Sequence, residues 1–328
     1  MNKYHIKPGK SCFCACMQNL LNSMGISYSE AEIFFLCDGM YCCFDTDALM
    51  AEHKNRLIFQ TFDKLLQAFS KHTGMIFEKS ERVYDIVEGD AVGRVLPLLA
   101  QVHAESLCYY KRIQNSEITV PVHSVLLYEI CPEKVYVGDP FIVNEQGFAD
   151  CYYGYVDKTD ILPFIFKFFW PIQSVHRHFF SKETMIDSIC RNITSFQRGN
   201  QRGSVLEGLP ALYAFLNELS KLNPKSISER YLLVETAFII NGNMMFVNDY
   251  LVDLLTEYSS HEDESAYVLK NIVDTKHVWE AAYMQLLRVG YKKDANSYGL
   301  ALDMIEQALY RQNQCLDKTV LFLTREHQ

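Results

Sequence analysis

Apolar residues recur near the helical period in the first part of the chain, and this pattern predicts two short helices. Residues 10–24 form the first, with Ser11 as its N-cap and Gly25 as the glycine that ends it. A second helix is predicted to begin at about Ser29 and to end at Gly39.

The middle of the chain alternates between extended apolar runs and amphipathic segments. Residues 56–77 predict a strand, a helix and another strand, and residues 88–104 predict an amphipathic helix despite Pro97. Strand-like runs then occur at 120–130, 134–138 and 151–156, with a hairpin turn at 131–134. Helices followed by an antiparallel sheet are typical of the α+β class.

After about residue 176 the strand signals fade and helical periodicity dominates. Six helices are predicted, separated by Gly, Asn and Pro residues, at 180–196, 205–221, 227–240, 246–258, 266–289 and 298–310. We therefore predict two domains, an α+β domain over residues 1–178 and a mostly helical domain over residues 179–328.

Composition and charge narrow the class of protein. The net charge of −9 argues against a nucleic-acid partner, because binding phosphates usually needs a basic face. The polar start lacks the apolar region of a signal peptide, and the longest apolar run, residues 161–170, is too short to span a bilayer. We expect a cytoplasmic protein without a membrane partner, whose eleven cysteines are free thiols.

Cys12 lies where a helix start would activate a thiol. The N-terminus of a helix concentrates partial positive charge and free N–H groups, which lower the pKa of a cysteine and can stabilise an oxyanion. The alternative is that Cys12 is a small residue that packs a helix start. Cys14 is a rival nucleophile on the same segment.

A base and an orienting group occur later in the chain. His123 begins an apolar strand, and Asp139 ends the next short strand, so a hairpin between them would bring both side chains to one rim of the sheet. Taken singly, His123 is also compatible with a core histidine, and Asp139 with a turn residue before Pro140. Together with Cys12 they predict a catalytic triad.

These segments resemble papain-like proteins of the C39 peptidase type. The stretch from Cys12 to Gly25 is similar to the nucleophile helix of that group, and His123 through Asp139-Pro140 is similar to its His-strand-turn-strand-Asp-Pro segment. Within the group, the chain most resembles the butirosin-type acyltransferase family, which is related to the peptidase-like amide synthase of closthioamide-type biosynthesis. The matching positions are Ser29-Glu30, Phe35-Leu36, Gly39 and, in the helical half, residues 213–218.

The resemblance implies a papain-like fold and an amide-forming reaction. Cys12 would take an acyl group from the phosphopantetheine thioester of an acyl or peptidyl carrier protein, His123 would shuttle the proton, and Asp139 would orient His123. A small amine would then capture the acyl group in specialised-metabolite biosynthesis. The resemblance implies no cofactor bound to the chain itself, because the phosphopantetheine belongs to the carrier. It also implies that the helical domain would be a lid that excludes water.

Two departures from the C39 pattern favour transfer over peptide hydrolysis. Phe13-Cys14 follows Cys12 where the group has Gly-Pro, and residues 5–7 contain no glutamine that could complete an oxyanion hole. Lys10 or backbone N–H groups near Cys12 are the expected substitutes. A cytosolic cysteine peptidase or amidase, and an inactive papain-like binding protein, are the alternatives.

The remaining polar clusters have weaker functional interpretations. Cysteines two apart on a helix diverge, so Cys12, Cys14 and Cys16 predict no metal site. We predict Lys10, Asp38 and Tyr41 as substrate-binding residues. Asp38, with Asp45 and Asp47, has the pattern of a solvated turn, and the alternative is that these carboxylates receive a cationic amine. The basic residues Arg191, Arg198 and Arg202 are either a solvated face or a docking site for an acidic carrier protein.

Overall fold

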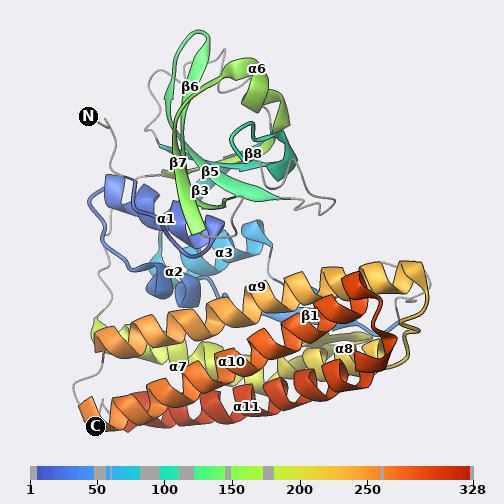
Figure 1. The fold of residues 1–328 in the computed structure, drawn as a ribbon. Coiled ribbons are helices and arrows are strands. Elements are labelled where there is room, and N and C mark those ends of the chain that lie inside the picture. The colour runs from blue at the N-terminus through green and yellow to red at the C-terminus, as the bar shows by residue number, and fades with distance from the viewer. Residues whose placement is uncertain are drawn as a thin grey trace. The chain divides into compact units, whose positions relative to one another are not determined.

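The structure is a computed structural model, and two compact units make up the chain. One unit comprises residues 1–33 and 66–178, and the other comprises residues 34–65 and 179–328. The structure describes residues 6–47, 57–59, 61–81, 97–110, 122–144, 149–172, 181–258 and 262–325. Both units mix helices with antiparallel strands, so the fold class is α+β, with a helical C-terminal region as predicted (Figure 1).

The first unit is built around a six-stranded antiparallel sheet with the order β3-β8-β4-β5-β6-β7. Its strands are β3 (Ile76–Ser80), β4 (Leu98–Val102), β5 (His123–Ile130), β6 (Lys134–Val143), β7 (Ala149–Asp157) and β8 (Ile165–Ile172). Short turns of helix, η3 (Ala104–Ser106), α6 (Lys158–Ile161) and η4 (Leu162–Phe164), connect some of them. Buried apolar side chains from β4, β5, β6 and β8 form the core of the sheet.

Helix α1 (Cys12–Ser23) packs against β4, β5 and β6 of this sheet (Figure 1). Its N-cap is Ser11, whose hydroxyl accepts the N–H of Cys14 at 3.2 Å. Gly25 follows its end with φ +75°, a left-handed conformation that glycine adopts without strain. The predicted boundaries of this helix are therefore confirmed at both ends.

Two further helices begin or end in the first unit. Helix α2 (Glu30–Leu36) starts at a capping box, in which the Ser29 hydroxyl accepts the Glu32 N–H and the Glu32 carboxylate accepts the Ser29 N–H. Helix α3 (Phe62–Thr73) lies between two strands along the chain, as the pattern of residues 56–77 predicted.

The helix predicted over residues 88–104 is wrong where the structure describes it. Strand β4 occupies Leu98–Val102, between β5 and β8, and all five of its residues are buried. A short apolar run interrupted by a polar residue, here Gln101, fits one face of a helix as well as a strand buried on both faces, which explains the error. Residues 88–96 lie outside the described part of the chain.

The second unit combines a small antiparallel sheet with long helices. The sheet has the order β2-β1-β10-β9 and contains β1 (Cys42–Asp45), β2 (Leu57–Phe59), β9 (Asn200–Arg202) and β10 (Val205–Glu207). The helices are α7 (Lys182–Arg198), α8 (Leu209–Leu219), α9 (Ile227–Tyr258), α10 (Glu262–Lys292) and α11 (Tyr298–Arg325), the last preceded by η5 (Ala295–Ser297). Helix α10 packs between α9 and α11.

Three helix predictions in this unit need correction. The segment 205–221 is not one helix, because β10 pairs with β1 and β9, and Gly208, with φ +68°, separates β10 from α8. The segments 227–240 and 246–258 are a single helix, α9. Packing against α10 keeps α9 continuous through the asparagine and glycine that predicted a stop.

The predicted domain 1–178 also needs correction, because residues 34–65 belong to the second unit. Strand β1 pairs with β10, and Phe44 makes an edge-to-face contact with Phe215, with 5.6 Å between ring centroids. Asn192 on α7 donates a hydrogen bond to the carbonyl of Phe35 at 3.0 Å. These contacts join segments far apart in the sequence, so local composition does not reveal them.

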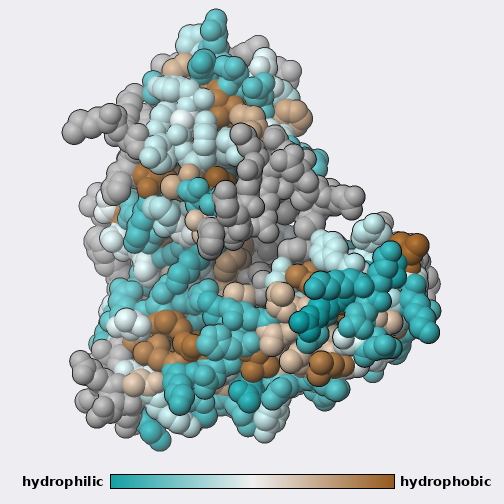
Figure 2. Space-filling view, viewed as in Figure 1, coloured by the Kyte–Doolittle hydropathy of each residue, from teal (hydrophilic) through white to brown (hydrophobic). Residues whose placement is uncertain are grey.

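Hydrophobic side chains lie in small groups between hydrophilic ones over the helices of the second unit (Figure 2). Ile227, Tyr231 and Tyr267 are each at least 60% exposed. Single exposed apolar residues are normal on a protein surface and do not define a docking face. Among the described helices, none has both the length and the apolar composition that a bilayer-crossing segment needs.

Candidate active site

Cys12 is the first residue of α1 and is partly exposed. The segment before it is fixed by backbone hydrogen bonds: the Gly9 N–H donates to the carbonyl of Pro140 at 3.0 Å. The buried carboxylate of Glu30 accepts the N–H groups of Lys10 and Ser11, at 2.9 and 2.8 Å. The sulfur of Cys12 therefore lies at the N-terminal end of α1, which carries the positive end of the helix dipole.

His123 and Asp139 form a buried pair. His123 Nε2 lies 2.8 Å from Asp139 Oδ2, and the two residues are 3% and 0% exposed. The second carboxylate oxygen, Oδ1, accepts the Phe141 N–H at 3.3 Å. Because Nε2 is held by Asp139, Nδ1 is the ring nitrogen left to exchange a proton with a nucleophile.

The hairpin of β5 and β6 brings this pair together. Cys131 donates its N–H to the carbonyl of Lys134 at 2.8 Å in the turn, which confirms the predicted turn at 131–134. Leu126 lies opposite Gly138, so Asp139 is diagonal to His123 on the same face of the sheet.

Charge and burial compete at His123. Burial by itself lowers the pKa of His123, but the carboxylate of Asp139 and a hydrogen bond and charge from Cys12 outweigh it, and they raise the pKa to about 10. His123 is therefore protonated at neutral pH, between a carboxylate and the thiol of Cys12. The three residues predicted from the sequence thus interact with one another, and an imidazolium beside a cysteine is the arrangement that stabilises a thiolate.

The neighbouring thiols of α1 are less accessible than Cys12. Cys14 is 4% exposed and Cys16 is 0% exposed. The Cys16 thiol donates to the carbonyl of Ser124, and burial, followed by the charge of Asp139, raises its pKa well above the usual value. Accessibility therefore favours Cys12 over Cys14 as a nucleophile.

Two adjacent tyrosines that the sequence analysis missed contact the pair. The Tyr109 hydroxyl donates to Asp139 Oδ2 at 3.2 Å, and its ring stacks on Tyr152 with 3.8 Å between centroids and 4° between planes. The Tyr110 ring makes an edge contact with His123, with centroids 5.5 Å apart. With 20 tyrosines in the chain, the Tyr109-Tyr110 pair carries no pattern that would single it out.

The predicted substrate-binding residues Asp38 and Tyr41 belong to the second unit, whereas Lys10 belongs to the first. Asp38 Oδ1 accepts a hydrogen bond from Asn192 Nδ2 at 2.9 Å. The Tyr41 hydroxyl donates to Glu207 at 3.0 Å, and burial, then this hydrogen bond, raises the pKa of Tyr41. These contacts stabilise the second unit, so a substrate role for Asp38 and Tyr41 stays a prediction.

Asp45 and Asp47 form a turn. The Asp45 carboxylate accepts the Asp47 N–H at 3.1 Å, as expected for the solvated-turn interpretation.

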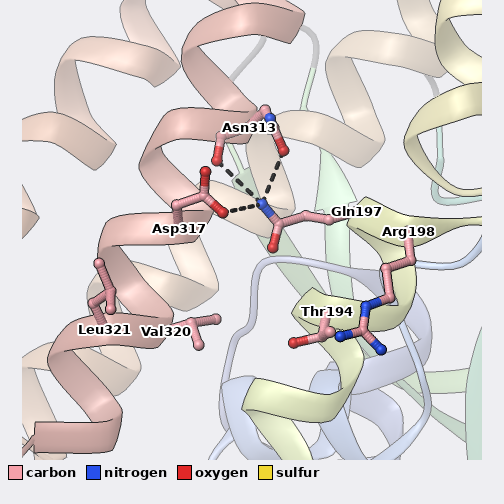
Figure 3. Close-up of a pocket in the computed structure, with 7 residues that line it drawn as sticks. All are labelled: Thr194, Gln197, Arg198, Asn313, Asp317, Val320 and Leu321. Carbon is pink, nitrogen blue, oxygen red and sulfur yellow. Dashed lines mark hydrogen bonds between the residues drawn. The ribbon is translucent and has the colours of Figure 1, made fainter.

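The predicted docking arginines lie on α7 and β9. Arg191 and Arg198 line one open cavity of about 670 Å³, and Arg202 ends the exposed strand β9. Arg198 also lines a cavity of about 710 Å³ between α7 and α11 (Figure 3). Asp187 and Asp317 line the same cavities, so this surface carries both signs of charge.

Comparison with known proteins finds no family model that matches this chain and no curated protein with significant similarity to it. Within the described ranges, no three His, Cys, Asp or Glu side chains are grouped so that they could share a metal ion.

Proposed function

We propose that the protein is a cysteine-dependent acyltransferase of papain-like fold that forms an amide through an acyl-Cys12 intermediate. The observation that carries this proposal is the buried contact of 2.8 Å between His123 and Asp139 beside a cysteine at a helix start. Helix α1 packed on an antiparallel sheet, with the base and the acid on adjacent strands, supports the papain-like arrangement.

The first half-reaction consumes a thioester. The Cys12 thiolate attacks the carbonyl carbon of the donor, and the carbon–sulfur bond to the donor thiol breaks as the tetrahedral intermediate collapses. His123 gives its proton to the departing thiolate, which leaves as a free thiol. The products are acyl-Cys12 and a neutral His123. The donor that we propose is the phosphopantetheine thioester of an acyl or peptidyl carrier protein.

The second half-reaction forms the amide. A neutral amine attacks the acyl-Cys12 carbonyl carbon, His123 takes the proton from the amine nitrogen, and the bond between the acyl carbon and Cys12 breaks. This step restores the thiolate and the imidazolium. An amide is more stable than a thioester, so the second step drives the sequence to completion without ATP.

The oxyanion of both tetrahedral intermediates needs hydrogen-bond donors. The N–H groups of Lys10 and Ser11 donate to Glu30, so these two of the backbone N–H groups near Cys12 are already engaged. Cys12 is at the first position of α1, where helix geometry leaves its own N–H without an intrahelical acceptor. We therefore assign the Cys12 N–H as one oxyanion donor.

The acyl-enzyme is tested by intact-protein mass. Wild-type protein and the Cys14→Ala variant, incubated with an acyl-pantetheine thioester, are expected to gain one acyl group, whereas Cys12→Ala gains none. Adding a primary amine should remove the acyl group and release an amide. If the acyl group is lost to water at the same rate with and without amine, the protein is a hydrolase; if no thioester acylates Cys12, the proposal is wrong.

The carrier-docking part of the proposal is tested separately. The double variant Arg191→Glu, Arg198→Glu reverses two charges on α7, and we expect it to raise KM for a carrier-bound donor much more than KM for the acyl-pantetheine donor. Equal changes for both donors would contradict docking at these arginines.

A further inference from the structure

We propose that Tyr109 is a positioning residue that sets the charge and the orientation of Asp139 for His123, an inference that rests on the proposed function. The Tyr109 hydroxyl and His123 Nε2 share one acceptor, Asp139 Oδ2, at 3.2 and 2.8 Å. With the Phe141 N–H on Oδ1, the carboxylate of Asp139 has three donors and is 0% exposed.

The ring of Tyr109 is itself held in place by the sheet. Tyr152 on β7 lies directly opposite Asp139 in the register of β6 and β7. The Tyr152 ring stacks on Tyr109 with an interplanar angle of 4°. Asp139 and Tyr152 are thus a cross-strand pair that holds Tyr109 at two points. Asp139 accepts the hydrogen bond of the Tyr109 hydroxyl, and Tyr152 stacks on the Tyr109 ring. The orientation of the hydroxyl toward Oδ2 is therefore restricted.

Tyr109 remains a donor over the whole working range of pH. Burial, followed by the charge of Asp139, raises the pKa of Tyr109 well above its usual value. The other titratable groups that act on it are Tyr152 on β7 and Cys16 on α1, and both raise its pKa further. A phenol O–H that stays protonated donates to the carboxylate permanently and withdraws part of its negative charge from His123.

The experiment compares the titration of His123, followed by NMR of its ring, in the wild type and in Tyr109→Phe. The phenylalanine ring keeps the stack on Tyr152 but removes the donor, so more charge remains on Oδ2 and His123 should titrate higher by about half a pH unit or more. The rate of acyl transfer should fall by about tenfold with a smaller change in KM, because a more basic His123 releases its proton less readily. Tyr136→Phe is the control, because it removes a hydroxyl from the same strand as Asp139, three residues earlier.

A second substitution at Tyr109 should shift the titration of His123 in the opposite direction. Replacing Tyr109 by 3-fluorotyrosine keeps the ring and strengthens the donor, so His123 should titrate lower than in the wild type. Unchanged titration in both variants, or shifts in the same direction, would overturn the role of Tyr109. The rate at which iodoacetamide alkylates Cys12 in the wild type separates the two proposals. If Cys12 reacts no faster than a model thiol, the proposed function is overturned. If Cys12 reacts faster but the titration of His123 does not shift in the variants, only the role of Tyr109 is overturned.

Discussion

Gly9 donates its N–H to the carbonyl of Pro140 at 3.0 Å, and this bond joins the segment before Cys12 to the residue after Asp139. The contact is possible because the backbone at Gly9 lies against α1. A Cβ at this position would be 2.3 Å from the Cβ of Ala15 and 2.8 Å from Glu30 Oε2. The absence of a side chain at residue 9 therefore sets the distance between the nucleophile and the His–Asp pair.

Gly9→Ala is expected to separate these two parts of the site. The added methyl group must displace Ala15 or the Glu30 carboxylate, which should destabilise the fold by about 1–3 kcal/mol. It should also slow the alkylation of Cys12, because the segment that presents Cys12 moves. Urea unfolding and iodoacetamide labelling measure the two effects.

Gly299→Ala on α11 is the matched control. A Cβ there meets nothing within 4 Å, and alanine is the better helix former, so the free energy of unfolding should stay the same or rise by up to about 1 kcal/mol. If both variants behave alike, close packing at Gly9 does not position Cys12.

The sequence predicted which residues of the candidate site lie together better than it predicted the bounds of the two units. The N-cap Ser11, Gly25 and the turn at 131–134 are local signals, and they sufficed to place Cys12, His123 and Asp139. Tyr109 lies 30 residues from Asp139 along the chain, in the turn after η3, and the two meet through a side-chain hydrogen bond that no local pattern encodes. The assignment of residues 34–65 to the second unit depends in the same way on the pairing of β1 with β10, which no local pattern encodes.

The stability of the protein should depend on pH through His123. Its pKa is about 10 in the folded protein, because Asp139 and Cys12 outweigh the effect of burial, and about 6.5 in the unfolded chain. The folded state thus binds one more proton than the unfolded state between these values. The stabilisation is complete below pH 6.5 and is lost as pH rises toward 10, with a slope of at most about 1.4 kcal/mol per pH unit.

Urea unfolding at several pH values measures this dependence. His123→Gln, which cannot titrate, should lack the component of the slope between pH 6.5 and 10. If the two proteins show parallel dependence on pH, His123 is not held as an imidazolium in the folded state.

Asp139→Asn should lower the pKa of His123 and remove its positive charge at neutral pH. Without the carboxylate, burial lowers the pKa of His123 and only Cys12 opposes it, so the imidazole is expected to be neutral at pH 7. Acyl transfer should fall by about 100-fold or more, because the base is no longer oriented and the thiolate loses its counter-ion. Single-turnover acylation of Cys12 measures the loss, and a variant that acylates at the wild-type rate would remove Asp139 from the mechanism.

Asn192→Ala tests whether residues 34–65 are part of the second unit. The Asn192 amide donates to the Phe35 carbonyl at 3.0 Å and to Asp38 Oδ1 at 2.9 Å, and Asn192 is 8% exposed. Alanine leaves these acceptors without that donor, so the unfolding free energy should fall by about 1–3 kcal/mol.

Asn243→Ala is the control, because the half-buried Asn243 amide donates to the Ile239 carbonyl within its own helix, and its loss should change stability by less than about 0.5 kcal/mol. Hydrogen exchange of β1 should accelerate in Asn192→Ala and not in Asn243→Ala, since only the first change loosens the segment that pairs with β10. Equal exchange in both would mean that β1 is held without Asn192.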